Sequence, residues 1–207
     1  MDKLSKHNLP TVADLKLDIN LDTLREATDR LNNQFKDVRS ANPMLCMNHE
    51  ELVKSVYDNF EQINLTTPSE ILPHTTSIKE RLRRKEEHLY NVPTEQYTGS
   101  YFENIVTQCQ SPASRIRITK LAPGKMIPWH VDYDVNYGVR CIVPIHGNDN
   151  VINLFKRDDK IEAYTLKDGT ANFLNIGYKH AVINMSNTPR IALMFTLNGT
   201  KDIQKLL

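Results

Sequence analysis

The sequence of 207 residues lacks the features that mark secreted and membrane-spanning proteins. Its three cysteines, Cys46, Cys109 and Cys141, are odd in number and far apart, with no CxxC pair, which predicts reduced thiols rather than a disulfide framework or a zinc knuckle. No apolar stretch follows the first residues, so we expect no signal peptide. No run approaches the roughly 20 apolar residues of a membrane span. We therefore expect a cytoplasmic protein without a membrane partner.

An excess of one charge sign is also lacking. The 26 Lys+Arg and 25 Asp+Glu residues leave a formal net charge of +1. Nucleic-acid-binding proteins usually carry a clear basic excess, so we expect no nucleic-acid partner. The basic segment 77–89 does not change this expectation, because Glu80 lies four residues before Arg84. Glu87 likewise lies four residues after Arg83, which predicts a helix with a charge-paired, solvated face.

Hydrophobic residues make up 40% and charged residues 25%, typical of one globular domain with one core. From about residue 20 to 90 the apolar spacing is helical. A first stripe consists of Leu21, Leu24, Ala27, Leu31, Phe35 and Val38. A second predicted helix starts at Asn48 and Glu51, which resemble a capping box, and has the stripe Leu52, Val53, Val56, Tyr57 and Phe60. A third is predicted from Ser77 to about Leu89. We interpret 1–111 as a helical region packed on the core.

After about residue 112 the chain becomes a series of short β-rich segments separated by turn residues. The predicted strands are Ser114–Leu121, Ile127–Asp132, Tyr137–Ile145, Val151–Lys156, Ile161–Leu166, Ala171–Asn175, His180–Met185 and Arg190–Leu197. This spacing favours a mainly β, α+β fold, a jelly roll or double-stranded β-helix of about eight strands. The helices would cover one outer face of a sheet. We expect one compact domain overall, with a core at 112–199 and a tail at 200–207.

A candidate metal site stands out among only seven histidines. His130 and Asp132 are two residues apart, and residues i and i+2 of a strand project to the same face. His180 begins a later predicted strand and could complete the set. Two imidazoles and one carboxylate on one face leave the opposite coordination positions open, as in the facial triad of non-haem iron(II) oxygenases.

Two arginines flank this pattern at matching offsets. Arg140 lies ten residues after His130, and Arg190 lies ten residues after His180. Each stands in an otherwise apolar run, where a guanidinium is costly unless it is paired. Bidentate pairing with a ligand carboxylate would satisfy each of them. An internal ion pair with Asp or Glu is the alternative at both positions.

Taken together, these residues resemble the aspartyl/asparaginyl β-hydroxylase family of 2-oxoglutarate oxygenases. The similar segments, within about 112–199, are Arg115–Gly124, Ile127–His130, Arg140, Lys167–Phe173, His180 and Arg190. The resemblance implies an iron(II) enzyme that consumes 2-oxoglutarate and O2, releases succinate and CO2, and hydroxylates its substrate. It makes His130 and His180 metal ligands.

The resemblance also assigns the cosubstrate contacts. Arg190 would bind the distal carboxylate of 2-oxoglutarate, with Arg140 and Thr119 as supporting contacts. The sequence departs from the pattern of the family and its superfamily at two positions. Some family members have a glycine where Asp132 stands, so the full triad brings this site closer to the free amino-acid hydroxylases of the superfamily. Many 2-oxoglutarate enzymes have a serine two residues after the clamp arginine, whereas this chain has Ala192.

Three other functions are open at this point. A cupin-like metal isomerase or binding module would need no cosubstrate, but the two arginines count against it. Nucleic-acid demethylases of the superfamily typically carry another arginine six residues after the clamp, where this chain has Thr196. A catalytically inactive sensor or interaction protein is disfavoured by the intact triad.

The substrate is expected to be an amino acid, peptide or protein residue hydroxylated at an aliphatic carbon. Tyr133 and Tyr137 follow the metal pair and should border its open positions. Trp129 precedes His130, so its ring is expected on the other strand face and in the core, with a contact to the substrate as the alternative. Tyr101, with Tyr97 and Glu103, could fold over the mouth as a lid.

Overall fold

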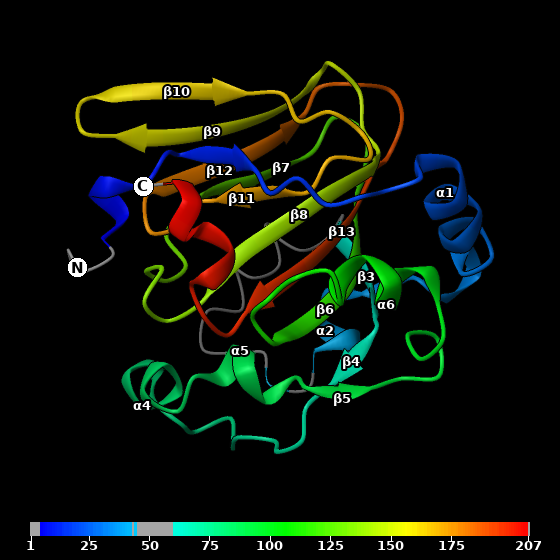
Figure 1. Cartoon of the computed structure of the whole chain (residues 1–207), viewed down its shortest axis with the longest axis horizontal. Helices are drawn as coiled ribbons and strands as arrows, with labels where there is room; N and C mark the ends of the chain where they lie inside the picture. Colours follow the sequence, from blue (N-terminus) through cyan, green and yellow to red (C-terminus); the bar gives the residue numbers. More distant parts are fainter. Residues whose placement is uncertain (1–4, 43, 45–59, 207) are drawn as a thin grey trace.

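The computed structural model describes residues 5–42, 44 and 60–206. Its core consists of two antiparallel sheets that face each other (Figure 1). All eight segments predicted as strands form strands. They are β6 (Ala113–Leu121), β7 (Met126–His130), β8 (Val139–His146), β9 (Val151–Arg157), β10 (Lys160–Tyr164), β11 (Asn172–Leu174), β12 (Lys179–Asn184) and β13 (Arg190–Leu197).

The eight strands divide equally between the sheets. The larger sheet has the order β1-β11-β8-β13-β6-β3-β2, and the smaller sheet has the order β10-β9-β12-β7. Of the eight, β6, β8, β11 and β13 therefore lie in one sheet, and the other four lie in the other. The chain crosses repeatedly from one sheet to the other, which makes the core the predicted double-stranded β-helix.

The described part of the N-terminal region contains strands as well as helices. It adds β1 (Val12–Asp14), β2 (Lys36–Asp37) and β3 (Phe60–Asn64) to the larger sheet, and β4 (Thr66–Thr67) pairs with β5 (Val92–Pro93). Its helices are α1 (Leu21–Asp29), α2 (Val38–Ala41), α4 (Ile78–Arg83), α5 (Glu86–Leu89) and α6 (Tyr101–Val106), with 3-10 turns at Lys6–Asn8 and Asn32–Gln34. A further 3-10 helix, Lys201–Leu206, follows the core. The division of the chain at residues 111 and 199 stays a prediction.

Three helix predictions meet different outcomes. The first helix is confirmed as α1, capped by the Asn20 side chain, but it ends at Asp29 because polar Asn32 and Asn33 begin a 3-10 turn and β2 pairs with β3. The stripe at residues 52–57 lies outside the described residues. Phe60, the last residue of that stripe, opens β3 and pairs with β6 instead.

The third predicted helix is divided. Lys85 adopts a left-handed backbone conformation (φ 50°) between α4 and α5, so the helical stripe does not continue across it. The predicted pairing of Glu87 with Arg83 is consequently wrong. Arg83 pairs with Glu80 (2.6 Å), whereas Glu87 turns toward the interior of the protein.

The larger sheet is buried on both faces. On β8, Val139, Cys141 and Val143 face a hydrophobic core that includes Leu24 of α1 and Phe102 of α6. The alternate residues of the strand face the smaller sheet, where a second apolar cluster and a cavity lie. Because successive strand residues point to opposite faces, polar side chains on the alternate positions project into the space between the sheets. Among the described residues, no helix is long and apolar enough to cross a membrane.

Candidate metal centre and cosubstrate pocket

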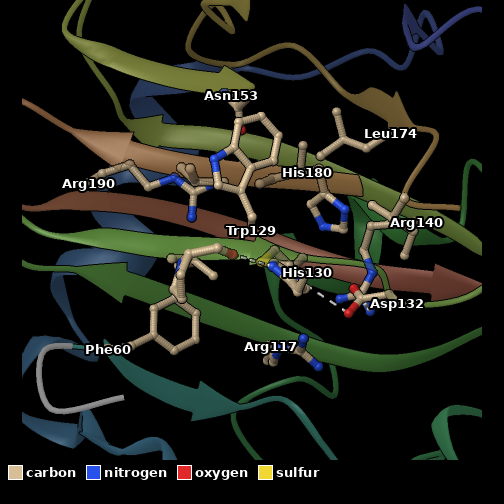
Figure 2. A pocket seen from close by; sticks show the side chains of 16 residues that line it. Phe60, Arg117, Trp129, His130, Asp132, Arg140, Asn153, Leu174, His180 and Arg190 are labelled. Atoms are coloured by element: carbon tan, nitrogen blue, oxygen red, sulfur yellow. Dashed lines mark hydrogen bonds and ion pairs between the residues drawn. The ribbon is translucent and has the colours of Figure 1, made fainter. Parts of the chain in front are cut away.

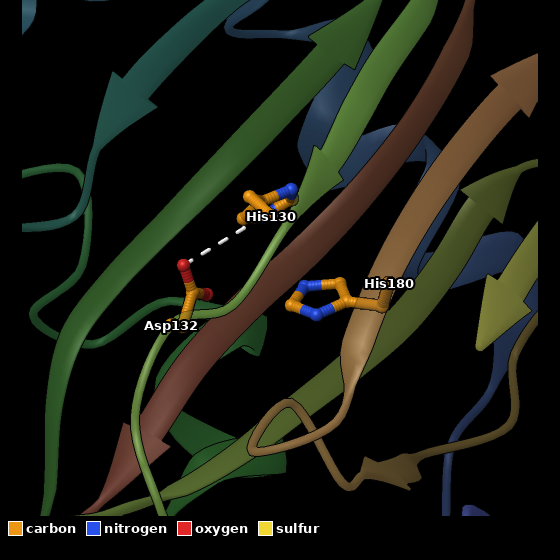
Figure 3. Close-up of side chains that lie close together, drawn as sticks. All are labelled: His130, Asp132 and His180. Atoms are coloured by element: carbon orange, nitrogen blue, oxygen red, sulfur yellow. Dashed lines mark ion pairs between the residues drawn. The ribbon is translucent and has the colours of Figure 1, made fainter. Parts of the chain in front are cut away.

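The three predicted metal ligands converge between the sheets. Strand β7 pairs with β12 so that His130 lies directly opposite His180, and Asp132 follows in the loop after β7 (Figure 3). The ring centroids of the two histidines are 4.2 Å apart. One potential ligand atom from each of the three residues lies within 4.8 Å of the other two.

Hydrogen bonds orient both imidazoles. Nδ1 of His130 lies 2.7 Å from the carbonyl of Pro128, and Nδ1 of His180 lies 3.0 Å from the carbonyl of Tyr178. A carbonyl oxygen only accepts, so each Nδ1 carries the hydrogen, and Nε2 keeps its lone pair for a metal ion. Burial, and then the neighbouring His130, lower the pKa of His180. The neutral, ligating form of His180 is thereby favoured.

The donor set fits iron(II). Nε2 of His130 is 3.6 Å from Oδ1 of Asp132, a separation that places both atoms around one position. Two neutral imidazoles and one carboxylate form the set typical of non-haem iron(II) oxygenases. Three protein ligands on one side leave room on the other side for a chelating cosubstrate.

A cavity of about 400 Å³ adjoins the triad, and Arg190 lines it. The side chain of Arg190 comes from the first residue of β13, and the residue is only 3% exposed. Figure 2 shows Arg190 toward one end of the cavity and Asp132 with Arg140 toward the other, with the two histidines between them. The cavity thus joins a metal site to a buried guanidinium.

Arg190 has no ion-pair partner among the described residues. Its Nη1 donates to the hydroxyl of Thr119 (3.3 Å), and burial alone lowers its pKa to about 10. A buried guanidinium without a carboxylate is unfavourable unless a ligand supplies one. A dicarboxylate that chelates iron through one end and meets Arg190 through the other satisfies both sites. The residues present therefore fit 2-oxoglutarate.

Thr119 and Arg140 have different surroundings. Thr119 is fully buried on β6, and its hydroxyl donates to the carbonyl of Ala192 (3.2 Å) while it accepts from Arg190. Arg140 lines the cavity, but its Nη2 donates to Glu87 (3.2 Å) and to the Tyr133 hydroxyl (2.8 Å). The internal ion pair that the sequence left open is thus formed at Arg140. Its role as a cosubstrate contact stays a prediction.

Arg140 also approaches a predicted metal ligand. Its Nη2 lies 3.7 Å from Oδ2 of Asp132, so one guanidinium bridges the carboxylates of Asp132 and Glu87. Burial lowers the pKa of Arg140, but the neighbouring Tyr133, Glu87 and Asp132 outweigh this and raise it. The permanent cation helps to orient Asp132 for the metal.

The four aromatic residues predicted near the substrate separate in the structure. Tyr133 and Tyr137 stack with ring centroids 4.5 Å apart and line a neighbouring pocket. Trp129 lines the metal cavity (Figure 2), so the expectation that its ring packs in the core is wrong. The reason is that the pairing of β7 with β12 shifts register between His180 and Val182, and this β-bulge at Pro128 and Trp129 interrupts the strict alternation of side chains between the two faces.

Tyr101 is not placed at the site. Its hydroxyl accepts a hydrogen bond from the backbone N–H of Asn20 (2.6 Å), and its ring packs against the main core beside α1. Tyr97 is likewise buried in that core. The predicted lid is therefore wrong, because α6 packs against α1 on the outer face of the larger sheet.

Three charged residues near the site were missed from the sequence: Glu87, Arg115 and Arg117. Arg117 lines the metal cavity, and all three line the neighbouring pocket. Arg117 and Thr119 are two residues apart on β6 and share its inner face. This spacing could have placed Arg117 near the predicted cosubstrate contact. No pattern in the sequence points to Glu87 as an interior residue.

The sequence matches one model of a known protein family. The model of the aspartyl/asparaginyl β-hydroxylase family matches residues 74–199. No curated protein was found to be similar to the sequence.

Solved structures with a similar arrangement include two oxygenases and a cupin. A prolyl-4-hydroxylase from Pseudomonas putida has a TM-score of 0.49 at 12% identity and covers 91% of each chain. An oxidoreductase of the 2OG-Fe(II) oxygenase family from Burkholderia pseudomallei has a TM-score of 0.42 at 13% identity, over 68% of this chain and 70% of the other. A cupin domain from Bordetella pertussis has a TM-score of 0.33 at 18% identity, over 42% of this chain and 82% of the other.

The family match covers more than half of the chain, from α4 to the end of β13, and includes all three residues of the triad and Arg190. The chain belongs to the aspartyl/asparaginyl β-hydroxylase family, a family of 2-oxoglutarate- and iron(II)-dependent hydroxylases.

Proposed function

We propose that this chain hydroxylates an aliphatic carbon of an amino acid, either free or in a peptide, with conversion of 2-oxoglutarate to succinate and CO2. The observation that carries the proposal is the buried Arg190, which lacks an ion-pair partner among the described residues and shares one cavity with His130, Asp132 and His180. A cytoplasmic location, where thiols and iron(II) stay reduced, is part of the proposal.

The metal ligands, Arg190 and the apolar lining of the cavity have distinct roles in this reaction. His130, Asp132 and His180 would hold the iron, which supplies the oxidising chemistry when it is bound with 2-oxoglutarate and O2. Arg190 would fix the distal carboxylate of 2-oxoglutarate by a charge-assisted pair, with Thr119 orienting the guanidinium. Trp129 and the apolar residues of the cavity would exclude water from the reacting carbon.

The test is product analysis by mass spectrometry. The purified protein is incubated with iron(II), 2-oxoglutarate, O2 and a panel of amino acids and peptides. We expect succinate together with a product that is heavier by one oxygen atom and carries a hydroxyl on carbon. Succinate formed with only demethylated products, or with no oxidised product from any member of the panel, would reject the proposed reaction.

A further inference from the structure

A second pocket, of about 320 Å³, lies on the Asp132 side of the metal cavity. Four residues, Phe60, Arg117, Asp132 and Arg140, line both pockets, so the two adjoin beside the metal site. The second pocket is also lined by Arg81, Glu86, Glu87 and Arg115. None of these four residues lines the metal cavity.

Two arginines in this pocket are buried with unused donors. Arg115 is 5% exposed, and the side chain of Arg117 is 11% exposed. Nε and Nη1 of each are shielded from solvent and have no hydrogen-bond partner among the described residues. Buried donors of this kind destabilise the fold unless a partner arrives, and charged donors do so more than neutral ones.

Glu87 does not satisfy these donors. Its Oε2 accepts from Arg140 (3.2 Å) and from Thr196 (3.3 Å). Its oxygens lie 3.8 Å from Nε of Arg115 and 4.0 Å from Nη1 of Arg117, too far for hydrogen bonds. Glu87 is therefore shared by three guanidinium groups. Even when Asp132, which Arg140 also approaches, is counted, these three arginines exceed the nearby carboxylates by one positive charge.

Arg81, in the wall of the same pocket, shows how a structural arginine is bonded in this protein. Its guanidinium donates to the carbonyls of Thr76, Met44 and Pro73 and to the carboxylate of Glu86 at 2.7–3.0 Å. Its three nitrogens all have partners. The unused donors of Arg115 and Arg117 are thus not a general property of buried arginines in this fold.

The backbone also directs Arg115 into the pocket. The backbone of Arg115 has a left-handed conformation (φ 51°), which residues other than glycine rarely adopt within a strand. It lies where the pairing of β6 with β13 shifts register, in a β-bulge, and its guanidinium stacks on Tyr90 at 3.7 Å from the ring centroid. Bulges commonly re-aim a side chain next to a functional site.

The charge of Arg117 is also poorly compensated. Burial and the neighbouring Arg115 and Arg140 lower the pKa of Arg117 to about 9, a sign that an anion would stabilise these three arginines.

We propose that Arg115 and Arg117 form a subsite that binds a carboxylate of the substrate and presents the adjoining carbon chain to the metal site. This inference rests on the hydroxylase function proposed above and narrows its substrate class to acids. A guanidinium pairs best with a planar carboxylate, and the donors are buried, so the anionic group must enter the pocket. The carboxylate can belong to a free amino acid or to an Asp or Glu side chain of a peptide.

The first experiment compares acids with their amides on the complete wild-type enzyme with iron(II), 2-oxoglutarate and O2. One arm pairs the common free L-amino acids with their α-carboxamides. The other pairs end-capped tripeptides containing Asp or Glu with the same peptides containing Asn or Gln. Within the productive arm, we expect an acid to stimulate succinate formation at least tenfold more than its amide, and this arm identifies the source of the carboxylate. If no acid exceeds its amide in either arm, the inference is wrong.

The unstimulated wild-type reaction separates this failure from failure of the proposed function. Iron-dependent succinate formation without any acid–amide difference rejects only the carboxylate subsite. Absence of iron-dependent succinate formation under every condition rejects the hydroxylase function itself.

The second experiment locates the subsite with Arg115→Met and Arg117→Met. For the acid found above, we expect KM to rise at least tenfold, with a smaller change in kcat and with the preference for acid over amide lost. Arg83→Met removes the same charge from an exposed position and should keep the wild-type KM. If either Met variant fails to fold, Arg117→Lys keeps the charge and should give an intermediate KM. Variants with lower melting temperatures but unchanged acid preference would show a purely structural role and overturn the assignment.

Discussion

The guanidinium of Arg190 donates to the hydroxyl of Thr119 over 3.3 Å, across the paired strands β13 and β6. Both residues are buried inside the jelly roll, and Arg190 lines the metal cavity. Thr119 offers Arg190 only a neutral acceptor, which leaves the positive charge available to a ligand. This relationship leads to two predictions about cosubstrate binding.

Replacing Arg190 by Met keeps much of the bulk of the side chain and removes its charge. We expect 2-oxoglutarate binding to weaken by roughly 2–5 kcal/mol, the usual cost of truncating one partner of a buried charge pair. Iron binding should persist, and Arg190→Lys should rescue binding only in part, because an ammonium cannot reproduce the planar fork. Calorimetric titration under anaerobic conditions measures both affinities. A lower melting temperature with unchanged 2-oxoglutarate affinity would indicate an internal ion pair instead.

Thr119→Val removes the acceptor of Arg190 and nearly preserves side-chain volume. We expect the affinity for 2-oxoglutarate to fall by about 1 kcal/mol, the scale of one hydrogen bond, because Arg190 is no longer held in place. Thr119→Ser retains the hydroxyl and should restore most of the affinity. Equal affinities for the Val and Ser variants would show that Thr119 does not orient Arg190.

The metal ligands are tested by His180→Ala and Asp132→Ala. Each variant removes one of three predicted protein ligands, so iron(II) affinity should fall at least tenfold while the circular dichroism spectrum stays near that of the wild type. His146→Ala is a matched control, because His146 lies at the end of β8 and does not line the metal cavity. Iron affinity that is unchanged in His180→Ala, or reduced equally in the control, would show that the triad is misassigned.

The lowered pKa of the Glu87 carboxyl predicts that the free energy of unfolding depends on pH. Burial raises its pKa, but Arg115, Arg140 and Arg117 outweigh this effect and set the pKa at about 2, below the ordinary 4.5. The folded pKa is the lower one, so the carboxylate stabilises the fold above about pH 4.5, and this contribution is lost as the pH falls toward 2. At about 1.4 kcal/mol per pKa unit, the contribution is about 3 kcal/mol.

The Glu87→Gln variant keeps the shape of the side chain and removes its charge. We expect it to be less stable than the wild type at pH 7, with the difference shrinking as the pH falls below 4.5. Urea unfolding at pH 7, 5 and 3 measures this convergence. A constant difference across the three pH values would contradict the role of Glu87 as the shared counter-ion.

The β core could be predicted because its signals are local. Apolar runs separated by turn residues marked all eight strands, and the HxD spacing with a later histidine marked the metal site. The N-terminal region was harder to predict. The charged and apolar pattern continues across Lys85, but the left-handed backbone conformation of this residue interrupts the helix. Glu87 then turns inward, an outcome that no pairing rule along a helix indicates.

The second limit on prediction was the face of the sheet to which each side chain of a strand points. In β6, Ile116 and Ile118 face the helices, whereas Arg117 and Thr119 face the interior between the sheets. A period of two shows which residues share a face, but it does not show which face borders a cavity. A sheet buried on both sides removes the usual clue, because its polar face does not meet solvent.

Conversion of 2-oxoglutarate to succinate by the purified protein tests the central claim most directly. Succinate is measured by mass spectrometry in the presence of O2, with iron(II) added or removed by a chelator. We expect succinate with iron and none without it, and near-complete loss in the His180→Ala variant. Stoichiometric iron binding without succinate formation, even with pools of amino acids and peptides added, would contradict the assignment.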